Sequence, residues 1–172
     1  KVMLLGDSHA HHLEHGLKKQ LGPNLSNMSF PSCIPFWGLD VYSKIYKQKY
    51  CLNAIKNAYD YLEKDKDIGM VVLASMGPVY MSGETFHGMG LRRVDGLQMA
   101  LNNNLSVTDR WVMYETALRD SLLRLQVNNK KVIFVIDVPE IGLDPKSCFL
   151  NEKAIGVDSS PPIRRQNLSN CT

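Results

Sequence analysis

Short apolar runs alternate with stretches of helical periodicity along this chain. The runs at residues 2–5, 69–75 and 131–137 are rich in Val, Ile and Leu, a pattern typical of strands that are buried on both faces. A weaker run lies at residues 25–30. We therefore predict four strands, over residues 2–6, 25–30, 69–75 and 131–137.

Between the strands, apolar residues recur every three or four positions, which predicts helices. The predicted helices span residues 10–21, 51–64 and 111–127, and Gly22-Pro23 ends the first of them. Residues 31–50 are predicted to form a structured loop. The Gly- and Met-rich residues 77–104 are too long for an ordinary connection, so we predict a functional loop or lid there. Residues after 142 show loop signals alone.

This alternation predicts an α/β fold, a flavodoxin-like three-layer α/β/α sandwich with a parallel sheet. Such sheets bind ligands at the carboxyl ends of their strands. Ser8, the loop after Ser75 and the loop after Asp137 should therefore meet at one edge. The chain supplies about four strands and no closing helix. We therefore expect residues 1–172 to form a single domain that lacks a C-terminal segment.

Composition narrows the class of protein. Apolar residues make up 44% of the 172 residues and charged residues 22%, as in ordinary globular domains. The net charge is +3 with no Lys/Arg block, which argues against a nucleic-acid partner. No apolar run approaches the ~18 residues of a membrane span.

The chain has four cysteines and no Cys-x-x-Cys pair, which argues against structural zinc. Four cysteines allow three disulfide pairings. We predict nearest-neighbour pairing, Cys33–Cys51 and Cys148–Cys171, which would close two loops of about 20 residues and imply an oxidising compartment. The alternative is a cytosolic domain with four buried thiols.

The triplet Gly6-Asp7-Ser8 follows the first predicted strand. Glycine suits a sharp turn, and Asp and Ser are preferred helix caps, so a capped turn is the simplest interpretation. A serine at this position also has its own N–H and the positive end of the helix dipole beside it. Ser8 is therefore the candidate nucleophile, with Asp7 and His9 as supporting residues.

Four histidines follow within seven residues: His9, His11, His12 and His15. On a helix, His11 and His15 share a face at a spacing that can bind a metal. The sequence places no third ligand beside them. We therefore predict a solvated helix face without a metal, with His9 at the mouth of the site.

Gly6-Asp7-Ser8-His9 resembles the first sequence block of the SGNH, or GDSL-type, hydrolase superfamily. It is most similar to the SGNH domains attached to acyltransferase-3 membrane proteins. Three further segments are similar to those domains: Pro31-Ser32-Cys33-Ile34-Pro35 followed by Cys51, Asp144-Pro145-Lys146-Ser147-Cys148, and residues 73–80, where Gly77 replaces the tryptophan of Leu-Ala-x-x-Trp-x-x-Tyr.

The resemblance implies that Ser8 is the nucleophile of an acyl transfer. The family's oxyanion hole uses the serine N–H, a glycine N–H and an Asn side chain. No Gly-x-Asn-Asp follows residues 69–75, so Ser8, Gly38 and Gly77 are the candidate donors here. The family's base is an Asp-x-x-His near the C-terminus, and the chain contains none. We expect that motif beyond residue 172 and poor activity without it. The alternative dyad is His87 with Glu84.

The resemblance further implies O-acetylation of a cell-surface polysaccharide hydroxyl. An attached or partner membrane acyltransferase would supply the acyl group, on the periplasmic or outer side of the membrane, and no cofactor is expected. The alternatives are a carbohydrate acetylesterase and a non-catalytic module that binds glycans, with Trp37 as part of a stacking platform.

Overall fold

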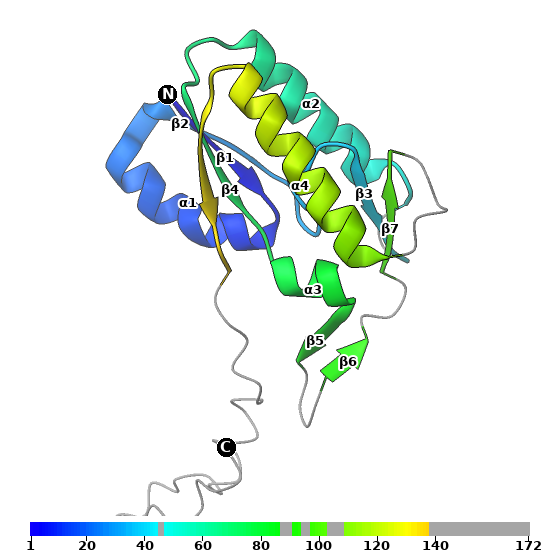
Figure 1. Ribbon diagram of the computed structural model, residues 1–172. Helices are drawn as coiled ribbons and strands as arrows, with labels where there is room; N and C mark the ends of the chain where they lie inside the picture. Colours follow the sequence, from blue (N-terminus) through cyan, green and yellow to red (C-terminus); the bar gives the residue numbers. More distant parts are fainter. Residues whose placement is uncertain (45–46, 87–90, 94–96, 103–108, 138–172) are drawn as a thin grey trace, which may run out of the picture. The chain divides into compact units, whose positions relative to one another are not determined.

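The computed structural model describes residues 1–44, 47–86, 91–93, 97–102 and 109–137. In this part of the chain four strands form a parallel sheet in the order β2-β1-β4-β8 (Figure 1). The strands are β1 (Val2–Gly6), β2 (Leu25–Ser29), β4 (Met70–Ala74) and β8 (Lys131–Val135). They lie within one or two residues of the four predicted strands, and the parallel sheet is confirmed.

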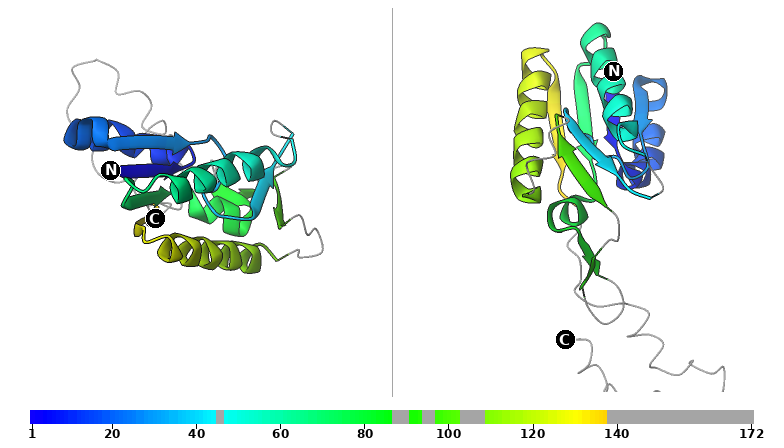
Figure 2. Two further views of the ribbon diagram at one scale, coloured as in Figure 1. Left: turned by 90° about the horizontal axis from the view of Figure 1, so that it is seen from above. Right: turned by 90° about the vertical axis from the view of Figure 1, so that its right-hand side faces the viewer.

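Helices cover both faces of this sheet (Figure 2). On one face, α1 (Ser8–Leu21) covers a small core around Leu4 and Val72. On the other, α2 (Tyr50–Lys64) and α4 (Arg110–Val127) cover a larger core that includes Leu5 and Leu73. Neighbouring residues of one strand thus enter opposite cores, as the two-residue period of a strand requires. The α/β/α class is confirmed.

Several short elements were not predicted. Within residues 31–50, β3 (Leu39–Tyr42) pairs antiparallel with β7 (Gln98–Leu101). Helix α3 (Gly77–Ser82) follows β4, and the 3-10 turn η1 (Gly22–Asn24) follows α1. Each has six residues or fewer, which is too short for a periodic pattern to identify.

A separate compact unit contains residues 84–93. Within it, β5 (Glu84–Phe86) and β6 (Leu91–Arg93) form an antiparallel pair, with Phe86 opposite Leu91. The sheet, the three long helices and the β3–β7 pair all belong to the other unit.

Strand β8 is less buried than its sequence predicts. Ile133 is 47% exposed and Ile136, just beyond the strand, is 84% exposed. In the described part of the sheet β8 pairs with β4 alone. An apolar sequence therefore occupies an edge position here. Within the described residues, no helix is both long enough and apolar enough to cross a membrane.

Candidate active site

Ser8 is the first residue of α1, directly after the turn at which β1 ends. Gly6 is required in this turn, because a Cβ at that position would collide with the carbonyl oxygen of Ala74 on β4. The next residue, Asp7, is 1% exposed, whereas Ser8 is exposed. The close approach of two parallel strands thus places the serine at the carboxyl edge of the sheet, as predicted.

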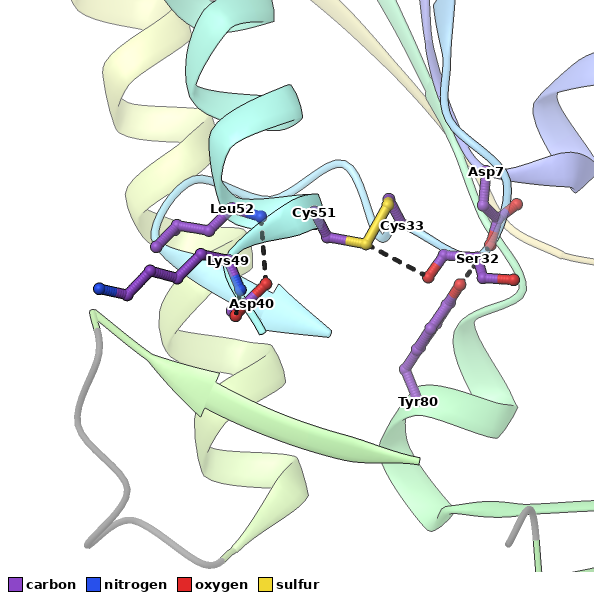
Figure 3. Close-up of a disulfide and its surroundings, with 8 residues drawn as sticks. All are labelled: Asp7, Ser32, Cys33, Asp40, Lys49, Cys51, Leu52 and Tyr80. Carbon is purple, nitrogen blue, oxygen red and sulfur yellow. Dashed lines mark hydrogen bonds between the residues drawn. A yellow bond between two sulfur atoms is a disulfide. The ribbon is translucent and has the colours of Figure 1, made fainter. Parts of the chain in front are cut away.

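The buried Asp7 carboxylate fixes the turn from three directions. Its Oδ1 accepts a hydrogen bond from His9 N at 2.8 Å, which caps α1. Its Oδ2 accepts from the Tyr80 hydroxyl at 3.0 Å (Figure 3). The same oxygen accepts from Met76 N, also at 3.0 Å. A carboxylate can accept several hydrogen bonds at once. Asp7 therefore ties the start of α1 to the loop after β4 and to α3.

The Ser8 N–H lies beside this network. The N–H groups of the two following residues, His9 and Ala10, donate to Asp7. Ser8 N–H occupies the first helical position, where the helix itself supplies no acceptor. The N-terminus of a 14-residue helix also carries a partial positive charge. This geometry suits a serine whose own N–H stabilises the oxyanion that forms on the carbonyl oxygen of an acyl group attacked by its hydroxyl.

A carboxylate–imidazole pair lies next to Ser8, and sequence reasoning did not foresee it. Asp137, two residues beyond β8, has its Oδ1 3.0 Å from His9 Nδ1. The two residues are 128 positions apart, so only the strand order brings them together. Across the described residues, no histidine is hydrogen-bonded to the Ser8 hydroxyl.

Two further polar side chains are buried near the turn. Tyr114 of α4 lies with its hydroxyl 3.1 Å from the position that a Gly77 Cβ would occupy. Burial, reinforced by the Asp137 and Asp7 carboxylates, raises the pKa of Tyr114 to about 12. Ser75, directly after β4, is buried, and its hydroxyl has no hydrogen-bond partner in the described structure.

The candidate oxyanion glycines lie in different surroundings. Gly77 begins α3, and its N–H donates to the Ser75 carbonyl oxygen at 2.9 Å. Gly38 has a φ of 76° and packs against Asn102, whose N–H donates to the Gly38 carbonyl at 2.7 Å. Gly77 follows Met76, whose N–H donates to Asp7, and this places Gly77 one residue from the Ser8 turn. The contacts of Gly38 link it to the β3–β7 pair.

Other predicted residues fall outside this description. His87, Cys148 and Cys171 lie outside the described residues, as does the side chain of Glu84, the first residue of β5. The alternative dyad and the second predicted disulfide therefore stay predictions.

A comparison with known protein families tests the resemblance to SGNH domains. The family model described as "SGNH domain (fused to AT3 domains)" matches residues 1–170. The chain belongs to this family. No curated protein matches the chain. The suspected resemblance is confirmed over nearly the whole sequence, including the Gly-Asp-Ser-His turn.

The SGNH domain contains the first predicted disulfide, Cys33–Cys51. It links the loop after β2 to the first turn of α2, and both cysteines are fully buried. Beside it, the buried Asp40 carboxylate accepts hydrogen bonds from Lys49 N at 2.6 Å and Leu52 N at 3.1 Å (Figure 3). The bond and the carboxylate together fix the start of α2.

A pocket of about 360 Å³ opens in the SGNH domain next to this helix start. Trp37 forms part of its wall, and the Arg124 guanidinium covers the Trp37 ring at 3.6 Å from the centroid. Tyr59 contacts the indole in a T-shaped arrangement. Trp37 is thus partly core and partly pocket wall. The lining residues are Trp37, Gly38, Lys49, Leu52, Asn53, Lys56 and Asn102.

The remaining histidines of α1 face solvent. His11, His12 and His15 are exposed, and the His12 ring lies 5.4 Å from the His9 ring. Within the described ranges, no three His, Cys, Asp or Glu side chains are placed to hold a metal ion.

Proposed function

We propose that this SGNH domain transfers an acyl group, most simply acetyl, through an ester on Ser8. The observation that carries the proposal is an exposed serine at the N-terminus of α1. The buried Asp7 caps this helix by accepting a hydrogen bond from His9 N, and this fixes the backbone at Ser8. The family match supports acyl-transfer or esterase chemistry in general. The acetyl group and the acceptor are our inference.

In the proposed first step, Ser8 Oγ attacks the carbonyl carbon of an acyl donor. The C–O bond to Ser8 forms, and the negative charge that develops on the carbonyl oxygen faces the Ser8 N–H and the helix dipole. Collapse of this intermediate expels the donor's alcohol or thiol and leaves acyl-Ser8. In the second step an acceptor hydroxyl attacks the acyl carbon, and Ser8 Oγ leaves.

Both steps need a base that removes a proton and later returns it. We propose a histidine from outside the described residues, on an Asp-x-x-His segment or at His87 with Glu84. Gly38 and Gly77 remain the proposed backbone donors, although the Gly77 N–H donates to the Ser75 carbonyl oxygen in the structure and would have to leave it to reach an oxyanion. Of the two, Gly77 has the closer chain of contacts to the Ser8 turn.

We further propose that the acceptor is a cell-surface polysaccharide and that a membrane acyltransferase domain supplies the acyl group. Fusion to AT3 domains, which defines the family, supports the donor. The Cys33–Cys51 disulfide supports an oxidising compartment, which means the periplasmic or outer side of the membrane. An acetylesterase would use the same acyl-Ser8 and transfer it to water.

A second function, non-catalytic glycan binding, is supported by the Trp37 pocket. An indole edge, two lysines and two asparagine amides are the groups that bind hydroxylated sugars through contact and hydrogen bonding. In an acyltransferase the same pocket would hold a neighbouring part of the polymer. In a binding module it would be the sole functional site.

Labelling of Ser8 separates these functions. In the full-length protein, p-nitrophenyl acetate or a sulfonyl fluoride should modify Ser8 in wild type and not in Ser8→Ala. Ser82→Ala, an exposed serine on α3, is the matched control and should be labelled like wild type. Absence of labelling at Ser8, together with retained glycan binding that is lost in Trp37→Ala, would favour the binding module.

A further inference from the structure

The His9 imidazole is held in one orientation by Asp137. The Nδ1–Oδ1 distance is 3.0 Å, and the two side chains are 28% and 14% exposed, respectively. His9 is also fixed through its backbone, because its N–H donates to the buried Asp7. Carboxylates at the ends of two strands, β1 and β8, therefore position a single residue adjacent to the nucleophile.

This contact decides which ring nitrogen is exposed for chemistry. A carboxylate oxygen accepts hydrogen bonds, so the proton of the pair lies on His9 Nδ1. In the neutral ring, Nε2 then carries a lone pair and is an acceptor. The same arrangement orients histidines in other sites, where a carboxylate behind the ring sets its tautomer.

The ring does not act on Ser8 itself. Consecutive helix residues project ~100° apart, so Ser8 and His9 point to different sides of the α1 start. No hydrogen bond joins the two side chains in the described structure. Ser8 and His9 are the first two residues of α1, so both lie at the carboxyl edge of the sheet, where an acyl-Ser8 would form.

We propose that His9 Nε2 accepts a hydrogen bond from a hydroxyl of the incoming acyl acceptor that neighbours the attacking hydroxyl, and that Asp137 is the positioning residue that holds His9 for this purpose. The inference rests on the proposed acyl transfer. The hydrogen bond orients the acceptor oxygen toward the acyl carbon of acyl-Ser8. The proton that is lost in the attack goes to the base that serves Ser8, so His9 forms no bond in the step.

The competing explanation is that the pair merely tethers α1 to β8, and two substitutions distinguish the two roles. Asparagine places its amide nitrogen near the position of Nδ1, so His9→Asn keeps a donor for Asp137 and removes the acceptor at Nε2. Glutamine reaches the position of Nε2, so His9→Gln restores an acceptor there. If the pair is only a tether, His9→Asn should behave like wild type. If His9 binds the acceptor, His9→Asn should lose transfer to the acceptor and His9→Gln should recover part of it.

The test measures how acetyl-Ser8 divides between water and a sugar in the full-length protein. The donor is p-nitrophenyl acetate and the acceptor is methyl β-glucopyranoside. The control variant is His15→Asn, because His15 is exposed on α1. We expect His9→Asn to lower the sugar-to-water ratio about tenfold, the effect of one lost hydrogen bond, and the control His15→Asn to keep both the ratio and Ser8 acetylation within twofold of wild type. His9→Gln should recover part of that ratio. Equal ratios in wild type and His9→Asn, whatever their value, would overturn the proposal.

A readout that needs no turnover separates this inference from the proposed function. In Ser8→Ala with ¹⁵N-labelled histidine, the His9 signals should show a protonated Nδ1 and a bare Nε2, and methyl β-glucopyranoside should shift Nε2. Asp137→Asn should change the tautomer signature. An Nε2 signal that the sugar leaves unmoved would overturn the inference. Failure of Ser8 to become acetylated in wild type would instead overturn the proposed function, and the ¹⁵N titration would still decide the role of His9.

Discussion

Removal of the Asp7 carboxylate should destabilise the domain strongly. The side chain is 1% exposed and accepts hydrogen bonds from His9 N, Met76 N and the Tyr80 hydroxyl. In Asp7→Ala all three donors lose their acceptor. An unsatisfied buried donor costs about 1–3 kcal/mol, and some of that cost is recovered when water enters. We expect a loss of about 4 kcal/mol.

Smaller changes should give graded losses. Tyr80→Phe removes one hydrogen bond to a charged acceptor, so we expect about 1.5 kcal/mol. In the Asp7→Ala/Tyr80→Phe double variant that hydrogen bond is lost only once. The two substitutions should therefore be non-additive by about 1.5 kcal/mol. Tyr61→Phe is the control, because Tyr61 donates to a carboxylate, Asp65, at an exposed position. It should leave stability unchanged.

Urea unfolding followed by circular dichroism measures these differences. With a denaturant slope of about 2 kcal/mol/M, a loss of 4 kcal/mol lowers the midpoint by about 2 M. If Asp7→Ala shifts the midpoint by less than about 0.3 M, or if the two substitutions are additive, the carboxylate does not hold the turn and this reasoning is wrong.

Three further predictions concern single features. Replacing Cys33 and Cys51 together by Ala should cost about 3 kcal/mol, because the disulfide closes a loop of 18 residues; the urea midpoint measures the loss, and an unchanged midpoint would contradict it. Ser75→Ala should raise stability by about 1 kcal/mol, because it removes a buried hydroxyl without a partner; a lower midpoint would indicate a contact that the structure does not contain. Burial and the nearby Asp137 raise the pKa of Tyr114 to about 12 from the usual 10, so its contribution to stability is complete below pH 10 and is lost as the pH rises toward 12. Tyrosinate absorbance should show this late titration, and Tyr114→Phe should remove it.

The sequence was sufficient to predict the sheet and its helices. Runs such as Met70–Ala74 are apolar without interruption. A strand that is buried on both faces has apolar residues at successive positions, so such a short run predicts a strand. The start of α1 was predicted two residues too late. Periodicity begins at the first apolar position of a helix, whereas the helix itself begins at its cap, here Asp7.

The position of Ser8 was predicted, and its role as nucleophile stays a prediction. Its place at the start of a helix could be predicted because strand, turn and helix lie next to each other in the sequence. Asp137 was not predicted, because its contact with His9 depends on β8 pairing with β4 and β4 with β1. Register between strands that are far apart in sequence is set by tertiary packing. The sequence did show that Asp137 follows a predicted strand. The order of the strands was also needed to infer that Asp137 lies beside His9.

The two carboxylates together explain how the proposed nucleophile, Ser8, can be fixed without contributing to the fold. Asp7 binds the backbone of His9, and Asp137 binds its side chain, so the residue after Ser8 is held at two points. Ser8 itself makes neither contact, and its side chain is exposed. Its N–H direction is set by its neighbours, which leaves the hydroxyl free to be acylated. Ser8→Ala should therefore unfold at the wild-type midpoint while losing acylation, and an activity loss in that variant can be assigned to chemistry rather than to structure. The converse holds for Asp7, whose loss should weaken fold and activity together.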